Sequence, residues 1–179
     1  MKRVKAIGLP VLLLLAGCMK DELPVPAKPR GDARELQVCM GFGYQEQVWM
    51  DLSSGEVLRT NVKTAWDLSF ESAPEGWRIM LNGARLMTAW DIGDVDMALP
   101  MDTGGMGAGR RIDAPSGHPD STAFGDWRGT GHVHVLGLGY DAMGRHLGFR
   151  KVRPLSVGAS GYTLETARLD GTEVTTITV

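Results

Sequence analysis

The sequence has no marked excess of charge of either sign, few aromatic residues and only two cysteines. Among its 179 residues, 19 are Lys or Arg and 21 are Asp or Glu, a balance that argues against nucleic-acid binding through overall charge. Aromatic residues make up 7% of the chain, whereas glycine occurs 24 times. This combination favours a turn-rich β architecture over a helical bundle.

Recognised catalytic motifs are also missing from the sequence. It contains no G-x-S-x-G nucleophile elbow, no P-loop and no H-E-x-x-H zinc motif. No histidine is placed so that Cys39 would serve as a nucleophile. We therefore predict that the protein is not an enzyme.

The longest apolar run lies at the N-terminus. Residues 7–16 form a stretch of about ten apolar residues, too short to cross a bilayer as a helix. Lys2, Arg3 and Lys5 precede it, as in the basic region of an export signal. This pattern predicts that the chain is exported.

Residues 15–18, Leu-Ala-Gly-Cys, resemble the lipobox of bacterial lipoproteins. In that motif the cysteine thiol receives a diacylglycerol and becomes the new N-terminus after cleavage. The alternative is an ordinary thiol beside a non-lipid cleavage site. The resemblance implies a signal peptide over residues 1–17 and a lipidated Cys18, whose acyl chains would hold the protein on a membrane surface.

The segment after Cys18 is predicted to be a tether, over residues 18–35. Residues 19–22, Met-Lys-Asp-Glu, look like the signal that directs lipoproteins of some Gram-negative bacteria to the outer face of the outer membrane, although such charges also solvate a tether. Residues 23–29 contain three prolines and are expected to be an extended spacer. The predicted location is thus the outer membrane, lipid-anchored and exposed at the cell surface. With Cys18 lipidated, Cys39 has no disulfide partner and is expected to be a small core residue.

Residues 36–179 show strand periodicity and are predicted to form one all-β domain. Ser53, Ser54 and Gly55 separate two alternating runs, and Asn82-Gly83 is a signal for a two-residue hairpin between residues 77–81 and 84–90. Further strands are expected at residues 132–138, 147–153, 162–168 and 174–179, with a connection at 154–161. About ten short strands predict an antiparallel β-sandwich or a partly open barrel.

Five segments, in their order and spacing, resemble the HmuY-like family of haem-binding lipoproteins. They are residues 43–57, 66–70, 79–84, 138–152 and 162–171. The resemblance implies an all-β fold, anchoring at the cell surface, and capture of haem for delivery to an outer-membrane transporter. Family members place their haem ligands on loops and hairpin tips at one end of the sheets.

The corresponding insertion in this chain is a Gly/Met-rich loop at about residues 93–125. A haem site needs an apolar slot, axial ligands for iron and cations near the propionates. The candidate axial ligands are Met97, Met101, Met106 and His118, and the candidate propionate contacts are Arg110 and Arg111. For each methionine the alternative is a packing role, and for the histidine and the arginines it is a solvated loop position.

A second ligand-like feature is Gly-His-Val-His-Val at residues 131–135. On a strand, His132 and His134 point to one face, as in half of a zinc or iron site that still needs a third ligand. The alternatives are histidines that face solvent, make hydrogen bonds or contact haem. Asp67 is predicted to have a structural role, paired with a turn amide or with Arg78.

Two functions of different classes follow from these patterns. The first is a haem-binding surface lipoprotein that passes haem to an outer-membrane transporter for iron acquisition. The second is an accessory or structural surface lipoprotein that acts through protein contacts without a cofactor. The residues that separate them are those of the Gly/Met-rich loop, because haem requires its ligands to converge on one apolar slot.

Overall fold

The computed structural model describes residues 26, 31, 35–104, 106–116, 118 and 120–179. The chain divides into two units, Met1–Leu36 and Gln37–Val179, and every described strand belongs to the second. The predicted signal peptide at residues 1–17, Cys18 and most of the tether lie outside the described residues. No helix in the described part of the chain is long and apolar enough to span a membrane.

The all-β prediction is confirmed, with nine short antiparallel strands in open sheets and no α-helix among the described residues. The strands are β1 (Glu46–Asp51), β2 (Glu56–Val62), β3 (Leu68–Phe70), β4 (Ile79–Leu81), β5 (Thr88–Asp91), β6 (His134–Gly137), β7 (Phe149–Gly158), β8 (Gly161–Ala167) and β9 (Thr175–Thr178). Two short 3-10 helices accompany them, η2 (Phe42–Tyr44) and η3 (Gly83–Arg85).

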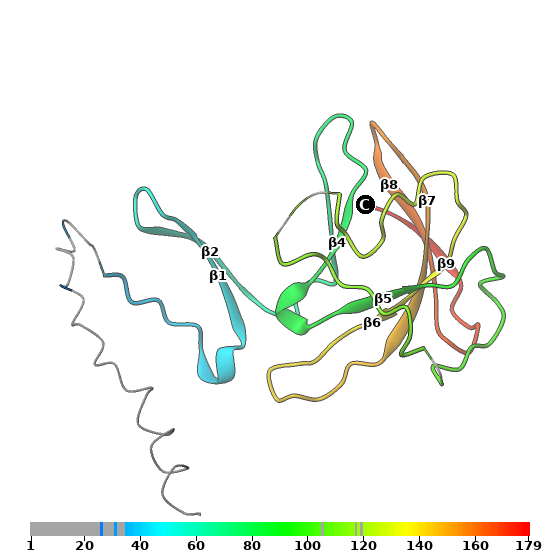
Figure 1. The fold of residues 1–179 in the computed structure, drawn as a ribbon, viewed down its shortest axis with the longest axis horizontal. Helices are drawn as coiled ribbons and strands as arrows, with labels where there is room; N and C mark the ends of the chain where they lie inside the picture. The colour runs from blue at the N-terminus through cyan, green and yellow to red at the C-terminus, as the bar shows by residue number, and fades with distance from the viewer. Residues whose placement is uncertain (1–25, 27–30, 32–34, 105, 117, 119) are drawn as a thin grey trace, which may run out of the picture. The chain divides into compact units, whose positions relative to one another are not determined.

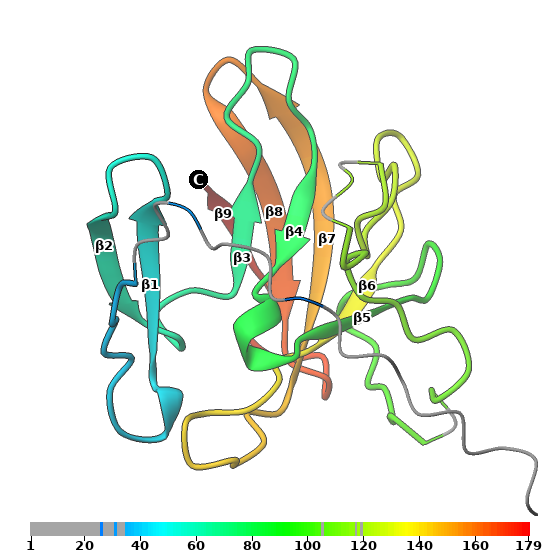
Figure 2. The same ribbon diagram turned by 60° about the vertical axis from the view of Figure 1, so that its left-hand side comes forward.

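The strands form three sheets (Figure 1). β1 pairs with β2, β3 pairs with β4, and the remaining strands form a five-stranded sheet in the order β5-β6-β7-β8-β9. Figure 2 shows the β3–β4 hairpin lying across the sheet near β8. In agreement, the rings of Phe70 on β3 and Tyr162 on β8 lie 4.9 Å apart. This hairpin and the large sheet enclose the main core between them.

The first predicted hairpin is present as β1–β2. Its turn is closed by the Asp51 carboxylate, which accepts hydrogen bonds from the Ser53 amide at 2.7 Å and the Ser53 hydroxyl at 2.6 Å. The hydroxyl contact and then the amide contact lower the pKa of Asp51. Local turn chemistry of this kind is readable from sequence, because a short side chain replaces the missing backbone partner.

The prediction of a two-residue hairpin at Asn82-Gly83 is wrong. Asn82 caps η3 instead, accepting from the Ala84 amide at 3.1 Å, and β4 pairs with β3 rather than with β5. The Asn82 side-chain amide also donates to the carbonyls of Lys63 at 2.7 Å and Trp66 at 2.8 Å. These tertiary hydrogen bonds stabilise the cap over a two-residue turn.

The prediction of a connection over residues 154–161 is also wrong, because β7 continues to Gly158 and β8 begins at Gly161. The register between β7 and β8 shifts between Pro154 and Ser156, which marks a bulge. Proline has no amide hydrogen for the ladder, and a bulge lets the strand pass it and continue.

Two clusters of buried side chains lie on opposite faces of the five-stranded sheet. Leu136, Val152 and Leu164 belong to the larger cluster, toward the β3–β4 hairpin, whereas Val133 and Ala167 belong to the smaller one. Alternation along each strand places them on opposite sides. The prediction that Cys39 is a core residue is wrong, because its side chain is exposed on the segment before β1.

Candidate binding cavities

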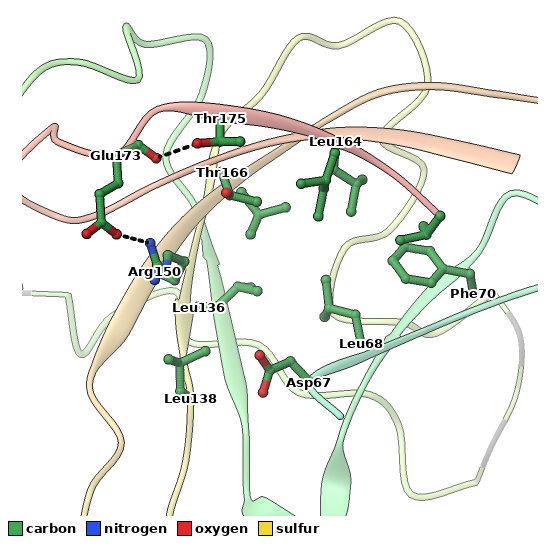
Figure 3. A pocket seen from close by; sticks show the side chains of 13 residues that line it. Asp67, Leu68, Phe70, Leu136, Leu138, Arg150, Leu164, Thr166, Glu173 and Thr175 are labelled. Carbon is green, nitrogen blue, oxygen red and sulfur yellow. Dashed lines mark hydrogen bonds and ion pairs between the residues drawn. The ribbon is translucent and has the colours of Figure 1, made fainter. Parts of the chain in front are cut away.

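An apolar cavity of about 560 Å³ lies between β3 and the five-stranded sheet. Figure 3 shows Leu68 and Phe70 entering it from β3, and Leu136 and Leu164 entering it from the sheet. The other lining residues are Asp67, Leu138, Arg150, Val152, Thr166, Glu173, Thr175, Ile177 and Val179. The volume falls in the range of about 300–1,000 Å³ that is typical of ligand pockets.

The charged residues of this cavity are paired with one another or with neighbouring residues. Glu173 accepts from Arg150 at 3.2 Å and from Arg168 at 2.7 Å, and these contacts, Arg168 first, lower the pKa of its carboxyl. The Asp67 carboxylate accepts from the buried guanidinium of Arg85, so the predicted structural role of Asp67 has Arg85 as the partner, not Arg78. The cavity therefore presents no unpaired charge to an occupant.

None of the candidate haem ligands lines this cavity. Met97 is buried in the smaller core cluster with Val133 and Ala167, on the opposite face of the sheet. Its backbone carbonyl accepts a hydrogen bond from the buried Lys151 ammonium at 2.6 Å. The methionine side chain thus fills the core rather than facing an open slot.

The other candidates from the Gly/Met-rich loop are less buried than Met97. Met101 and Met106 are half-buried, and the Met101 amide donates to the Leu169 carbonyl at 2.8 Å. His118 is exposed, and its Nδ1 accepts from the Asp120 amide at 3.3 Å. Neither the apolar cavity nor the groove described next is lined by any of the four candidate axial ligands.

A second cavity of about 620 Å³, here called the aromatic groove, lies on the other face of the sheet, over β5, β6 and β7. Its rings form a series in which Trp90 and Phe149 are 6.2 Å apart, Phe149 and His146 are 5.0 Å apart, and His146 and Tyr140 are 5.3 Å apart. The remaining lining residues are Leu86, Thr88, Gly107, Arg110, Gly137 and Gly139.

Glycine at position 137 is required for the packing of the groove. A Cβ atom there would lie 2.7 Å from the Thr88 hydroxyl oxygen and within 3.5 Å of the Trp90 and Phe149 rings. The indole nitrogen of Trp90 is buried and has no hydrogen-bond partner among the described residues. The groove therefore contains a donor that the described protein leaves unsatisfied.

Tyr140 and His146 are held side by side by a tight chain reversal. They form an isolated antiparallel bridge, and the Asp141 carboxylate closes the turn by accepting from the amides of Met143 at 2.8 Å and Arg145 at 2.9 Å. These contacts, with the Arg145 amide first, lower the pKa of Asp141. The Nδ1 atom of His146 accepts from the Gly148 amide at 3.1 Å.

Of the two arginines predicted to contact propionates, Arg110 lines one of the two cavities described above and Arg111 lines neither. Arg110 lines the aromatic groove and forms no ion pair with the residues that the structure describes. Arg111 forms an isolated antiparallel bridge beside β5, bonding through its backbone to Ala89 at 2.8 and 2.9 Å, and its guanidinium lies against Gly125. The two arginines therefore do not act as a pair.

His134 is the first residue of β6, and His132 lies two residues before the strand. The His132 ring lies 3.0 Å from the Asp91 carboxylate, whereas His134 is buried against Phe124 with a ring distance of 4.7 Å. Burial lowers the pKa of His134 to about 4. Across residues 35–104, 106–116, 118 and 120–179, no group of three or more His, Cys, Asp or Glu side chains is arranged to bind a metal ion.

Comparison of the chain with known protein families, with characterised proteins and with solved structures finds no match. Apart from Arg110, the residues of the aromatic groove were not proposed from the sequence as ligands. Tyr140, His146 and Phe149 do fall within residues 138–152, a segment that carries the family resemblance. The available signal was the pair of rings, Tyr140 and His146, on either side of the turn at residues 141–144, because loops held by a rigid scaffold often carry binding residues.

Proposed function

We propose that this domain is a non-catalytic haem-binding module of a lipid-anchored surface protein, and that haem binds in the aromatic groove. The observation that supports this site is the convergence of one imidazole, one phenol and one guanidinium on a single ring-lined cavity. Imidazole and phenolate groups are both known haem ligands, and arginine pairs with propionate carboxylates. The proposed role is capture of haem for an outer-membrane transporter.

The residues present fit haem chemically, although they differ from the ligands predicted from the sequence. Trp90 and Phe149 supply apolar walls, Arg110 supplies the cation, and Tyr140 or His146 supplies the axial atom. When bound, haem would contribute an iron atom that requires one or two such ligands. The Met97 thioether is buried in the core, and none of the three methionines or His118 lines the aromatic groove.

The hydrogen bond to His146 decides which of its nitrogens holds the proton. Because Nδ1 accepts from the Gly148 amide, the neutral ring carries its proton on Nε2. A ligand role for Nε2 requires the other tautomer and the loss of this hydrogen bond. Coordination by the Tyr140 phenolate would not break the hydrogen bond between His146 and the Gly148 amide. The two side chains are therefore separate candidates, and mutation distinguishes them.

The test is a haem titration of residues 30–179, followed by absorbance in the oxidised and reduced forms. The wild-type domain is expected to give a saturable Soret shift, and either Tyr140→Phe or His146→Gln is expected to weaken binding at least tenfold. Arg110→Gln should weaken it less, because one propionate contact is lost. Met101→Leu, Met106→Leu and His118→Gln are the matched controls and should bind as the wild type does.

Two results would contradict the proposal. Weaker haem binding in the methionine and His118 variants, with no change in Tyr140→Phe and His146→Gln, would return the site to the Gly/Met-rich loop. No Soret shift at micromolar haem would favour the second function, an accessory surface lipoprotein that acts through protein contacts.

The second function is supported by the apolar side chains that the domain exposes outside its cavities. On and beside the β1–β2 hairpin, Phe42 is 87% exposed, Leu52 is 87% exposed and Leu58 is 66% exposed. Exposed apolar residues that gather on one element are typical of protein contacts. Capture of an outer-membrane partner by the wild type, and its loss in Leu52→Ser with Leu58→Ser, would support this function.

A further inference from the structure

Strand β9 has one unpaired edge. Tyr162 and Val179 exchange backbone hydrogen bonds of 2.9 and 3.0 Å, which makes them a hydrogen-bonded pair of the β8–β9 ladder. Because bonded and non-bonded pairs alternate in an antiparallel ladder, Thr176 and Thr178 direct their N–H and C=O groups away from β8. No described residue accepts or donates at these outward backbone groups.

Strand β3 has a corresponding unpaired edge. The Glu71 amide bonds to the Arg78 carbonyl at 3.0 Å, and the Asn82 amide bonds to the Asp67 carbonyl at 2.9 Å. By the same alternation, Leu68 and Phe70 direct their backbone groups away from β4. Within the described part of the chain these groups also have no strand partner.

The apolar cavity is lined by both of these strands. Leu68 and Phe70 line it from β3, and Thr175 lines it from β9 (Figure 3). Ile177, also on β9, is a further lining residue. A second hollow of about 430 Å³ shares Phe70 and Val179 with the cavity. The apolar cavity beside both strands is here called the edge groove.

We propose that the edge groove binds an extended segment of a partner protein by strand addition. The backbone groups of Leu68, Phe70, Thr176 and Thr178 would pair with the segment, while its alternate side chains would enter the apolar cavity. A peptide main chain supplies donors and acceptors in alternation along both of its edges, which a lipid or another apolar small molecule does not.

The charges of the groove specify the chemistry of the segment. Arg150 is paired with Glu173 and Asp67 with Arg85, so the cavity offers no free charge for a charged side chain to neutralise. The occupant that complements it is uncharged, with apolar residues at every second position and no proline at the pairing positions. This inference concerns a different cavity from the aromatic groove and does not depend on haem binding.

The edge of β9 also lacks the features that usually prevent strand addition. Residues 174–179 are Val-Thr-Thr-Ile-Thr-Val, with no lysine, no proline and no bulge in the pairing with β8. Natural edge strands are commonly protected by at least one of these features. An edge without them, placed beside an apolar cavity, fits a pairing site.

The test uses the full chain in detergent micelles and a synthetic peptide of alternating valine and threonine, flanked by lysines for solubility. Saturable binding is expected, with at least tenfold slower hydrogen exchange at the amides of Leu68, Phe70, Thr176 and Thr178. The control peptide carries N-methyl groups on alternate amides, which removes one edge of donors, and should not bind.

Two protein variants keep the test decisive. Thr176→Pro removes an outward N–H that β8 does not use, and Thr176→Lys places a charge at the edge; each should reduce peptide affinity at least tenfold. Thr60→Lys, at an exposed position on β2, is the matched control and should bind normally. Absence of saturable binding, equal binding of the N-methylated peptide, or unchanged affinity in both Thr176 variants would overturn the proposal.

Discussion

The ammonium group of Lys151 donates hydrogen bonds to the backbone carbonyls of Met97 at 2.6 Å and Leu99 at 2.7 Å. Lys151 is fully buried on β7, and burial lowers the pKa of its ammonium group. This contact ties the start of the Gly/Met-rich loop to the sheet and buries the Met97 side chain in the smaller core cluster. With its side chain buried there, Met97 lines neither the apolar cavity nor the aromatic groove.

Replacing Lys151 by methionine is expected to destabilise the fold. The variant leaves the carbonyls of Met97 and Leu99 without a donor, at a cost of about 1–3 kcal/mol for each unsatisfied buried group. Urea denaturation measures the loss in free energy of unfolding. Arg145→Gln, which removes an exposed charge, is the control; equal stability of the two variants would contradict the structural role of Lys151.

The buried imidazole of His134 is expected to make stability depend on pH. Its pKa is about 4 in the folded protein, because burial, Arg111 and His132 outweigh the attraction of Asp91. The unfolded chain, with a histidine pKa of about 6.5, binds a proton first as the pH falls, so stability decreases from about pH 6.5 to about pH 4.

The size of this effect is on the order of 3 kcal/mol, from the difference between the folded and unfolded pKa values. Urea denaturation at pH 7, 5.5 and 4 measures it, with His134→Leu as the control that cannot titrate. The variant should show a flatter dependence in this window. Parallel pH dependences in the two proteins would mean that His134 is not the responsible group.

Asn82 is expected to be among the most sensitive polar positions. Asn82→Leu keeps the approximate volume but removes the partners of the Lys63 and Trp66 carbonyls and of the Ala84 amide, at a cost of roughly 2–4 kcal/mol. Thermal and urea unfolding measure this loss. Asn61→Leu, at a partly exposed amide, should cost less than about 1 kcal/mol, and a reversed order would count against the cap.

Alanine substitutions at Gly139 and Gly144 distinguish the cost of backbone strain from the cost of a steric clash. Both have positive φ, of 70° and 76°, but only at Gly139 would a Cβ atom meet the protein, 1.9 Å from the Arg85 carbonyl oxygen. Gly144→Ala should cost about 1 kcal/mol from φ alone, and Gly139→Ala roughly 3 kcal/mol or more. Similar unfolding free energies for the two variants would contradict the close approach.

Lipidation of Cys18 predicts a clear change in location. Cys18→Ala removes the thiol that would carry the acyl chains, so the protein should no longer partition with membranes, while the β-domain keeps its fold. Membrane fractionation and circular dichroism of the purified variant measure the two parts. Retention of the variant in the outer-membrane fraction would show that another segment anchors the chain.

The β architecture could be predicted from sequence because it depends on local chemistry. Alternation of Val48, Met50 and Leu52 with Trp49 and Asp51, and the turn at Ser53, led to β1–β2 with its correct bounds to within a few residues. A strand period and a turn residue act over neighbouring positions, so they can be read without a tertiary structure. The predicted export signal and the lipobox-like residues 15–18 rest on local patterns of the same kind.

Pairing and convergence were decided only by the tertiary structure. The choice between a hairpin turn and a helix cap at Asn82 depended on carbonyls of Lys63 and Trp66, which the local sequence does not indicate. Met97 is a core residue because it packs against Val133 and Ala167, and a lysine 54 positions away bonds to its carbonyl. Likewise, Tyr140 and His146, in the connection between β6 and β7, share a cavity with Arg110, whose neighbour Arg111 bridges to β5. Such long-range contacts follow from packing rather than from any local pattern.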